Sequence, residues 1–241
     1  MTALLAPAKL TLSLRITGVR DDGYHLIDAE MVTLDLADRL NIVDESAGEP
    51  SLAMADGSPA PGGDDDLVLR AMRACGRAAS VVLDKRIPSG AGLGGGSADA
   101  AAVLRWAGVT DPDLAASLGA DVPFCIVGGR ARVRGIGEQV EPLPFEARTF
   151  TLLTPDFGCA TPAVYAAWDR LGGPGAESGN DLEPAALSVE PRLGEVRDRL
   201  HQATGKPPRL AGSGSTWFVE GAFPECGVVV RTTPSGWAGV G

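Results

Sequence analysis

The stretch Lys85-Arg86-Ile87-Pro88-Ser89-Gly90-Ala91-Gly92-Leu93-Gly94-Gly95-Gly96-Ser97-Ala98-Asp99-Ala100 decides the fold of this chain. Its five glycines within seven residues let the backbone take positive φ and approach a ligand without intervening Cβ atoms. The β-branched segment 80–85 before it predicts a strand, and the alanine-rich segment 98–106 after it predicts a helix. A glycine loop at a helix N-terminus offers free N–H groups and the positive dipole end, which suits a phosphate chain. The alternative is an ordinary surface loop.

Two common phosphate motifs do not fit this stretch. It is no P-loop, because no lysine follows the glycines. Residues 90–95 satisfy the dinucleotide pattern Gly-x-Gly-x-x-Gly, but the expected helix starts several residues too late, and no acidic residue ends a second strand about 20 residues on. The stretch instead resembles the second motif of the GHMP kinases (galacto-, homoserine, mevalonate and phosphomevalonate kinases). Within this superfamily, Pro-x-Gly-x-Gly-Leu-Gly-Gly-Gly-Ser-x-x-Ala-Ala most resembles the 4-diphosphocytidyl-2-C-methyl-D-erythritol kinase family.

Length and composition are compatible with this resemblance. The 241 residues suffice for one large domain or two small ones that share a cleft, and 44% hydrophobic residues support a core. A net charge of −10 argues against a nucleic-acid-binding surface, which is normally basic. Cys75, Cys125, Cys159 and Cys226 show no metal-ligand spacing, so we expect reduced thiols. Residues 1–8 lack the features of a signal peptide and no apolar run approaches the length of a membrane span, which predicts a soluble cytoplasmic protein.

Lys9 stands out because arginine outnumbers lysine 18 to 3 in this chain. It begins an alternating segment in which Leu10, Leu12, Leu14 and Ile16 would face the core of a half-buried strand. On the residues alone, a lysine in solvent at a strand end is the favoured interpretation. The segment is similar to the first motif of the kinase family, however, and this implies that Lys9 lies in the active site beside the catalytic aspartate. Thr11 stands where the family has asparagine and is assigned to substrate binding.

Asp121 admits two interpretations that do not exclude each other. It follows a predicted helix over 113–118 and stands two residues before Pro123, as expected of a helix N-cap. The string Leu-Gly-Ala-Asp-Val-Pro-Phe over 118–124 also resembles the sequence around the family's catalytic aspartate. The resemblance implies that Asp121 accepts the proton of the substrate hydroxyl group while Lys9 orients it.

The string Asp-Gly-Tyr-His-Leu over 22–26 is the most specific clue to a substrate. Its Asp-Gly is a turn signal, and the strand-like segment 31–36 that follows predicts a hairpin. In the family the tyrosine stacks on cytosine and the histidine bonds the base edge, which implies these roles for Tyr24 and His25. Tyr165 lies on a helix predicted over 163–171, where the family has a second aromatic residue across the base. A tyrosine at the edge of the core is the alternative for Tyr165.

The sequence predicts the local structure of three further segments. Residues 45–66 predict an irregular surface excursion that ends at Asp66, a candidate N-cap for a helix over 67–78. The Thr161-Pro162 pair predicts the N-cap and first turn of the helix that carries Tyr165. The string Asn-Asp-Leu-Glu-Pro over 180–184 also occurs in the family, and we expect it to be structural.

The C-terminal part of the chain predicts a second, shortened domain. A new strand at 149–155 follows the linker-like segment 142–144, which divides the chain into domains 1–147 and 148–241. Residues 210–219 resemble the family's third motif, a glycine-rich turn that closes over the phosphates. Only residues 220–225 then separate two predicted strands, which is too few for the family's crossover helix. The resemblance to the GHMP kinases implies an α/β (α+β) fold, with an N-terminal domain like ribosomal protein S5 and a trimmed ferredoxin-like C-terminal domain.

The resemblance implies transfer of the γ-phosphoryl group of ATP to the 2-hydroxyl of 4-diphosphocytidyl-2-C-methyl-D-erythritol, with Mg²⁺ as cofactor. The expected partner is therefore a small cytidine diphosphate-linked polyol, with no nucleic acid and no membrane. The implied nucleotide contacts are Pro88, Ser89, Gly90, Ala91, Gly92, Leu93, Gly94, Gly95, Gly96, Ser97, Ala98, Gly212, Ser213 and Gly214, and Ser97 is also the candidate metal ligand. A GHMP kinase for another small alcohol is one alternative. A non-catalytic nucleotide-binding paralogue is the other, suggested by Thr11, Asp66 and the shortened second domain.

Overall fold

The computed structural model describes residues 2–45, 48–60 and 62–237, and the statements below concern those residues. The strands are β1 (Thr2–Val19), β2 (His25–Asp44), β3 (Ser51–Met54), β4 (Ser80–Asp84), β5 (Arg130–Gly135), β6 (Gln139–Leu143), β7 (Thr149–Leu153), β8 (Arg209–Leu210), β9 (Trp217–Glu220) and β10 (Val228–Arg231). The helices are α1 (Leu67–Ala74), α2 (Gly95–Ala107), α3 (Pro112–Leu118), α4 (Val122–Val127), α5 (Thr161–Arg170), α6 (Glu183–Val189) and α7 (Arg192–Thr204), with a 3₁₀ turn η1 (Gly63–Asp65).

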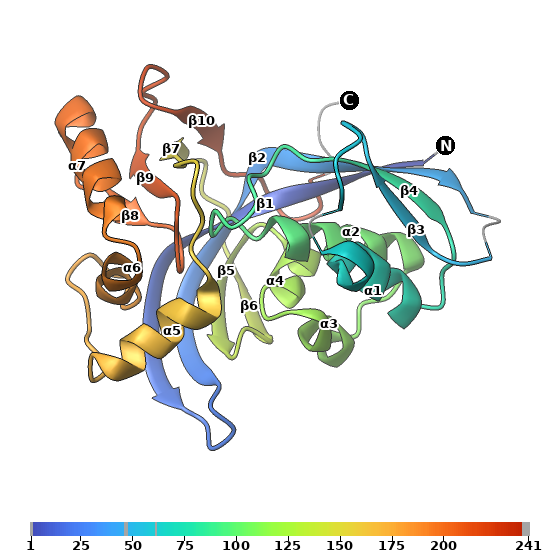
Figure 1. Ribbon diagram of the computed structural model, residues 1–241, viewed down its shortest axis with the longest axis horizontal. Coiled ribbons are helices and arrows are strands. Elements are labelled where there is room, and N and C mark those ends of the chain that lie inside the picture. The colour runs from blue at the N-terminus through green and yellow to red at the C-terminus, as the bar shows by residue number, and fades with distance from the viewer. Residues whose placement is uncertain (1, 46–47, 61, 238–241) are drawn as a thin grey trace.

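The strands form two sheets: the second, β7 to β10, lies at the left of Figure 1, and the long β1–β2 pair of the first passes beside it through the middle of the molecule. In the first, β1 pairs with residues 25–33 and 37–42 of β2, while β5 and β4 pair in turn with residues 27–32 and 39–44 of β2 on its other edge. The second sheet is antiparallel, with the order β10-β7-β9-β8. Helices α1 to α4 gather on one side of the first sheet, and α5 to α7 lie with the second (Figure 1). The predicted mixed α/β class is confirmed.

The β1–β2 hairpin is the predicted one, but β1 is irregular in a way that matters for the site. Its pairing with β2 shifts between Pro7 and Lys9 and again between Thr11 and Ser13. Such a β-bulge puts two residues opposite one and turns the following side chains. Leu10 lies in the apolar layer between the sheets, and Leu14 is 4% exposed within the other core cluster, so both face the core as predicted. After the second bulge Leu14 also lines the cavity together with Lys9 and Thr11, which simple alternation would place on the opposite face.

The chain after β10 ties the second sheet to the first. The backbone N–H of Arg231 donates to the Asp35 carboxylate at 2.8 Å, and the N–H of Thr233 donates to the carbonyl oxygen of Thr33 at 2.9 Å. These contacts fill the stretch of β2 that lies between its pairings with β4 and β5. The boundary predicted at residues 147–148 falls between β6 and β7, and the division into two domains stays a prediction.

The short connection between β9 and β10 contains no helix, as its length predicts. Both strands run antiparallel to β7 and flank it, so the connection crosses β7. The Thr151 hydroxyl in β7 fixes this crossing, because it accepts from the N–H of Phe223 and donates to the carbonyl oxygen of Gly221, each at 2.9 Å. A Cβ atom at Gly227 would lie 2.1 Å from the carbonyl oxygen of Leu152, so only glycine fits where the chain crosses.

Several local predictions need correction. The segment 45–66 is not irregular throughout: strand β3 pairs in parallel with β4, and η1 precedes α1, while residues 46, 47 and 61 lie outside the described residues. Asp66 is the N-cap of α1, with its carboxylate 2.9 Å from the N–H of Val68, but that helix ends at residue 74. The linker predicted over 142–144 is wrong, because Pro142 pairs with β5 on the edge strand β6.

Helix α2 begins at Gly95, three residues before its predicted start. Because the helix starts this early, its position does not exclude a dinucleotide-binding motif. The sheet pairing does exclude this motif: β5, the next strand after the loop and α2, pairs with β2 and β6 and not with β4, whereas a dinucleotide-binding fold needs a parallel βαβ unit around the loop.

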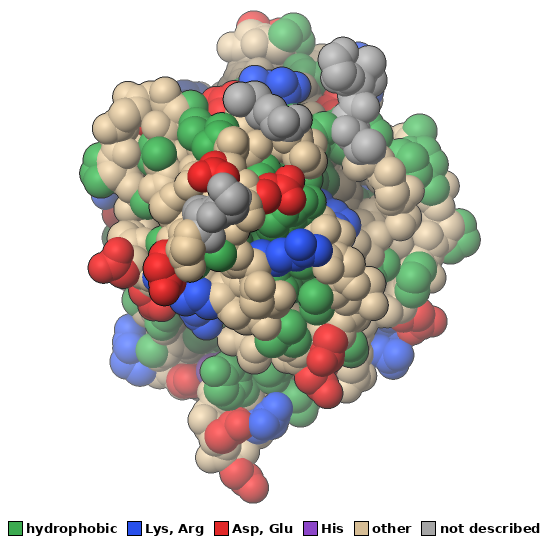
Figure 2. Space-filling view, turned by 90° about the vertical axis from the view of Figure 1, so that its right-hand side faces the viewer, with side chains coloured by type: hydrophobic (Ala, Val, Ile, Leu, Met, Phe, Trp, Pro, Cys, Tyr) green, Lys and Arg blue, Asp and Glu red, His purple; other side chains and the backbone are tan. Residues whose placement is uncertain are grey.

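The surface shows no single kind of side chain gathered over a wide area on the face drawn in Figure 2. Acidic, basic and hydrophobic side chains alternate there between stretches of backbone and small polar residues. In the described part of the chain, no helix is long and apolar enough to cross a membrane.

Candidate active site

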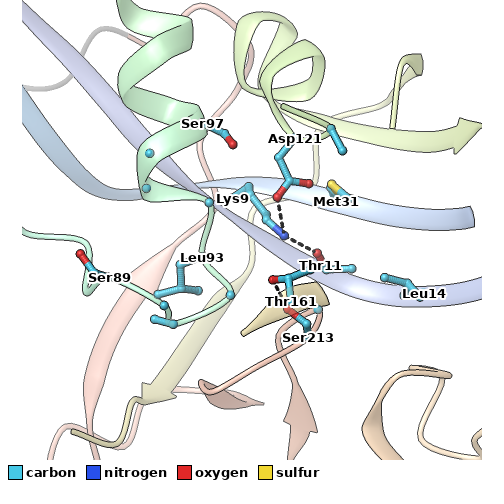
Figure 3. A pocket seen from close by; sticks show the side chains of 18 of the residues that line it. Lys9, Thr11, Leu14, Met31, Ser89, Leu93, Ser97, Asp121, Thr161 and Ser213 are labelled. Carbon is cyan, nitrogen blue, oxygen red and sulfur yellow. Dashed lines mark hydrogen bonds and ion pairs between the residues drawn. The ribbon is translucent and has the colours of Figure 1, made fainter. Parts of the chain in front are cut away.

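A cavity of about 410 Å³ opens where the two glycine motifs meet β1 and the start of α4 (Figure 3). Its volume falls in the range of small-molecule sites. Most residues predicted for the site line it: Lys9, Thr11, Pro88, Ser89, Gly90, Ala91, Gly92, Leu93, Gly94, Gly95, Gly96, Ser97, Asp121, Tyr165, Gly212 and Ser213. Ala98 and Gly214 are buried and do not line it, and neither Tyr24 nor His25 lines it.

The backbone of the glycine loop adopts left-handed conformations that favour glycine. Gly90, Gly92 and Gly94 have φ of +69°, +77° and +69°. A Cβ atom at Gly94 would lie 2.7 Å from Cγ of Lys9. The Lys9 side chain can therefore pack against the loop only because residue 94 is glycine.

Gly94 is also the N-cap of α2, and it has no side chain that could accept a hydrogen bond. The N–H groups of Gly95, Gly96 and Ser97 therefore lack an intrahelical partner, at the positive end of a helix of thirteen residues. Such a terminus beside a cavity is suited to bind phosphate oxygens.

Lys9 and Asp121 meet at the cavity wall (Figure 3). The ammonium of Lys9 lies 3.2 Å from Oδ2 of Asp121 and donates to the hydroxyl of Thr11 at 3.1 Å. The Lys9 side chain is 7% exposed and that of Asp121 is 30% exposed, so the carboxylate faces the cavity while the ammonium lies behind it. The backbone N–H of Lys9 donates to the carbonyl oxygen of Leu93 at 3.0 Å, which anchors β1 to the glycine loop.

Asp121 occupies the N-cap position of α4, yet its carboxylate makes no capping hydrogen bond. The position was predicted correctly, and the expectation of a side-chain cap was wrong, because the carboxylate turns to Lys9 instead. Thr161 shows a similar difference. It is the first residue of α5, not its cap, and its hydroxyl lies 2.9 Å from that of Ser213 in the third motif.

The third motif is fixed by the string over 180–184. The side-chain amide of Asn180 donates to the carbonyl oxygens of Leu210 and Gly212, at 2.9 and 2.7 Å. The carboxylate of Asp181 accepts from the N–H of Ile16 at 2.9 Å, which ties the same string to β1. These contacts agree with the structural role expected for this string.

Of the three aromatic side chains predicted for the site, only Tyr165 lines the cavity, and His25 packs behind it. Burial raises the pKa of the Tyr165 phenol, and the charge of Asp121 adds to this effect. The ring of His25 packs against that of Tyr165, with 4.8 Å between centroids, and its Nε2 lies 2.8 Å from Oδ1 of Asp169. Tyr24 is 58% exposed beside the hairpin turn. The structure thus brings His25 and Tyr165 together and leaves Tyr24 at the surface.

Sequence reasoning missed Lys85, which lines the cavity from the loop's own N-terminal end. Its ammonium lies between the carboxylates of Asp38 and Asp99. The scarcity of lysine in this chain, which drew attention to Lys9, applies equally to Lys85 and could have indicated it.

Metal-binding groups are few. Among the described residues, no group of three or more His, Cys, Asp or Glu side chains could hold a metal ion. Ser97, the candidate from sequence, lines the cavity in the first turn of α2 (Figure 3). All four cysteines are free, and burial raises the pKa of Cys125 to about 12, so this thiol is unreactive.

Comparisons with known proteins agree with this geometry. A family profile described as GHMP kinases N terminal domain matches residues 66–129, which include the glycine loop and Asp121. The chain is 41% identical over 235 residues to a protein of Paracoccus denitrificans (strain Pd 1222) named 4-diphosphocytidyl-2-C-methyl-D-erythritol kinase, covering 88% of this chain and 84% of that protein. A protein of the same name from Cereibacter sphaeroides (strain KD131 / KCTC 12085) is 37% identical over 271 residues, covering 98% and 97%.

Solved structures show the same relationship. The crystal structure of a 4-(cytidine 5'-diphospho)-2C-methyl-D-erythritol kinase matches with a TM-score of 0.77 at 33% identity, covering 98% of this chain and 100% of the other. A homoserine kinase from Cytophaga hutchinsonii matches with a TM-score of 0.61 at 18% identity, and this similarity shows the shared fold alone.

Proposed function

Since this chain belongs to the 4-diphosphocytidyl-2-C-methyl-D-erythritol kinase family of GHMP kinases, we propose that it phosphorylates the 2-hydroxyl group of 4-diphosphocytidyl-2-C-methyl-D-erythritol with ATP. The observation that carries this proposal is the Lys9–Asp121 pair, 3.2 Å apart beside the free N–H groups of α2. A protein that only bound the nucleotide would need the helix terminus and the glycine loop. It would not need a half-buried carboxylate paired with an ammonium.

The residues present fit a nucleoside triphosphate. The first turn of α2 offers three N–H groups, and the glycines leave room for phosphate oxygens where Cβ atoms would stand. Ser97 would hold a Mg²⁺ ion together with the phosphates, and the ion would supply neutralisation of their charge. Because phosphoryl transfer needs little covalent chemistry from the protein, positioning of the two substrates supplies most of the rate.

Asp121 is the base in this proposal. Its exposed carboxylate oxygen accepts the proton of the attacking hydroxyl group, within a cavity that also receives the nucleotide. Lys9 orients the carboxylate from behind and offsets negative charge that develops in the transition state. Thr11 holds the ammonium from its other side, so it takes the place of the asparagine in the family motif.

The cytidine end of the substrate would bind at Tyr165 and His25. The half-buried Tyr165 lines the cavity, and the ring of His25 is held against its ring by Asp169. Aromatic faces stack on nucleic-acid bases, and a histidine nitrogen can read a base edge. Tyr24, at the exposed hairpin turn, would cover the other face of the base.

The test is an ADP-release assay with the purified full chain. We expect turnover with 4-diphosphocytidyl-2-C-methyl-D-erythritol and none above background with homoserine or mevalonate. Phosphorus–carbon couplings in the carbon-13 NMR spectrum of the product should place the new phosphate on the 2-oxygen, because C2 carries no hydrogen. Turnover with one of the other alcohols alone would reassign the substrate, and absence of turnover with all three would contradict the proposal.

A further inference from the structure

A lysine and two aspartates form a buried ionic cluster at the base of the glycine loop. The ammonium of Lys85 lies 2.5 Å from Oδ2 of Asp38 and 2.9 Å from Oδ2 of Asp99. The side chains of Asp38 and Asp99 are 0% and 3% exposed. None of the three residues belongs to the catalytic pair or to the predicted nucleotide contacts. A cluster of this kind costs desolvation energy, so its place in the fold needs a reason.

The cluster holds both ends of the loop on strand β2. Lys85 directly precedes the loop and Asp99 follows it in α2, so one ammonium bridges two points fourteen residues apart in sequence. Asp38, from β2, also accepts from the backbone N–H groups of Arg86 and Ile87, at 2.5 and 2.8 Å. The chain on either side of the loop is therefore fixed to one buried carboxylate.

The ammonium also lies beside the N-terminus of α2. A Cβ atom at Gly95, the first residue of that helix, would stand 2.9 Å from Nζ of Lys85. A positive charge at the positive end of a helix dipole is unfavourable by itself. It becomes favourable when an anion binds at the same terminus, which is what the free N–H groups of α2 are suited to do.

The charges within the cluster are unequal. Two carboxylates face one ammonium, and Oδ1 of Asp99 is buried without a hydrogen-bond partner among the described residues. Burial would lower the pKa of Lys85, but the two carboxylates outweigh it and raise that pKa, so the lysine stays charged.

We propose that Lys85 is a positioning residue for the nucleotide: it holds the glycine loop and the first turn of α2 in the geometry that receives the phosphates, and its charge favours their binding. This inference rests on the proposed function only in that the loop binds a nucleotide. The opposing interpretation is a buried ion pair that contributes stability and has no effect on the ligand.

A charge-balanced double variant separates the two interpretations. Lys85→Met alone would leave two buried carboxylates facing each other, which could prevent folding. Lys85→Met combined with Asp99→Asn removes one charge of each sign and leaves Asp38 with its two backbone donors. Calorimetry with MgADP then reports binding without any alcohol substrate. We expect a melting temperature close to that of the wild type and MgADP affinity reduced at least about tenfold.

A second variant keeps the test decisive if the first does not fold. Lys85→Arg preserves every charge, but a planar guanidinium cannot place one nitrogen between Asp38 and Asp99. We expect it to fold, to bind MgADP more weakly than the wild type, and to exchange the amide hydrogens of residues 90–97 faster. Wild-type MgADP affinity in a folded form of either variant would overturn the proposal. Wild-type protein that binds MgADP but fails the ADP-release assay would instead contradict the proposed function.

Discussion

Gly92 and Ala211, from the two glycine motifs, are packed so closely that a Cβ atom on Gly92 would lie 2.2 Å from the carbonyl oxygen of Ala211. The contact joins the loop before α2 to the turn between β8 and β9, two segments from different sheets. The N–H of Thr216 donates to the carbonyl oxygen of Ala91 at 3.1 Å and reinforces it. The cavity proposed to receive the phosphates therefore lies at a junction between the sheets, and its shape depends on both.

Gly92→Ala should therefore destabilise the protein more than Gly90→Ala does. Both positions have positive φ, so both variants carry the backbone strain of a left-handed alanine, about 1–2 kcal/mol. At Gly90 the atom nearest to a new Cβ is 3.4 Å away, which the structure can accommodate. At Gly92 the new Cβ would lie only 2.2 Å from the carbonyl oxygen of Ala211, so the backbone must move. Urea unfolding measures the difference. Equal losses of unfolding free energy in the two variants would show that the junction can open at no cost.

Thr11→Val should lower turnover without weakening nucleotide binding. Valine keeps the shape of threonine but removes the oxygen that accepts from Lys9 at 3.1 Å, so the ammonium is held by Asp121 alone. We expect kcat to fall roughly tenfold, the scale of a lost hydrogen bond to a charged group. Thr11→Ser, which keeps the hydroxyl, is the matched control. Unchanged kcat in the valine variant would mean that the hydroxyl does not position Lys9.

The His25 site predicts a split between the two substrates. His25→Ala removes a ring that packs on Tyr165 and is remote from the glycine loop, so KM for the cytidine substrate should rise about tenfold or more. KM for ATP should stay close to the wild-type value. His201→Ala on α7 serves as the control, because His201 is the chain's other histidine and is exposed. A parallel rise in both KM values after His25→Ala would assign His25 to the fold.

Asp99 predicts a pH-dependent stability. Burial raises its pKa to about 7 from the usual 3.8, against the lowering effect of Lys85. Because the folded state prefers the protonated form, this residue reduces stability progressively as pH rises from about 4 to 7. Asp99→Asn removes the titration. Its melting temperature relative to the wild type should therefore increase between pH 5 and pH 8, by about 2–4 °C for each kcal/mol regained. A constant difference over this range would refute the assignment.

The sequence indicated the parts of the site better than their arrangement. The glycine loop and its helix were identified from local patterns, because glycine content and helix signals are properties of short segments, and the turn at 210–219 was identified from its resemblance to a family motif. The pairing of Lys9 with Asp121 joins residues 112 positions apart, and only the resemblance to a kinase family suggested it. Pattern alone favoured a solvent lysine and a helix cap, and the structure shows that the carboxylate makes no cap.

The features that the sequence did not predict depend on contacts between distant segments. The cluster around Lys85 draws its carboxylates from β2 and α2, and no local pattern connects Asp38 with Asp99. The second bulge in β1 depends on register with β2, so alternation could not show that Leu14 lines the same cavity as Lys9 and Thr11. Thr161 was predicted to cap α5, because a residue with a hydroxyl group directly before proline usually caps a helix. Its hydroxyl group instead forms a hydrogen bond with Ser213, 52 residues away.

The most direct test of the account is the turnover of Asp121→Asn with 4-diphosphocytidyl-2-C-methyl-D-erythritol and MgATP. Asparagine keeps the size and the contact to Lys9 but cannot take the hydroxyl proton. With wild-type melting temperature and MgADP affinity as controls, the account predicts that kcat falls roughly 10²–10⁴-fold, the range of general-base catalysis. A folded variant with kcat near the wild-type value would contradict it.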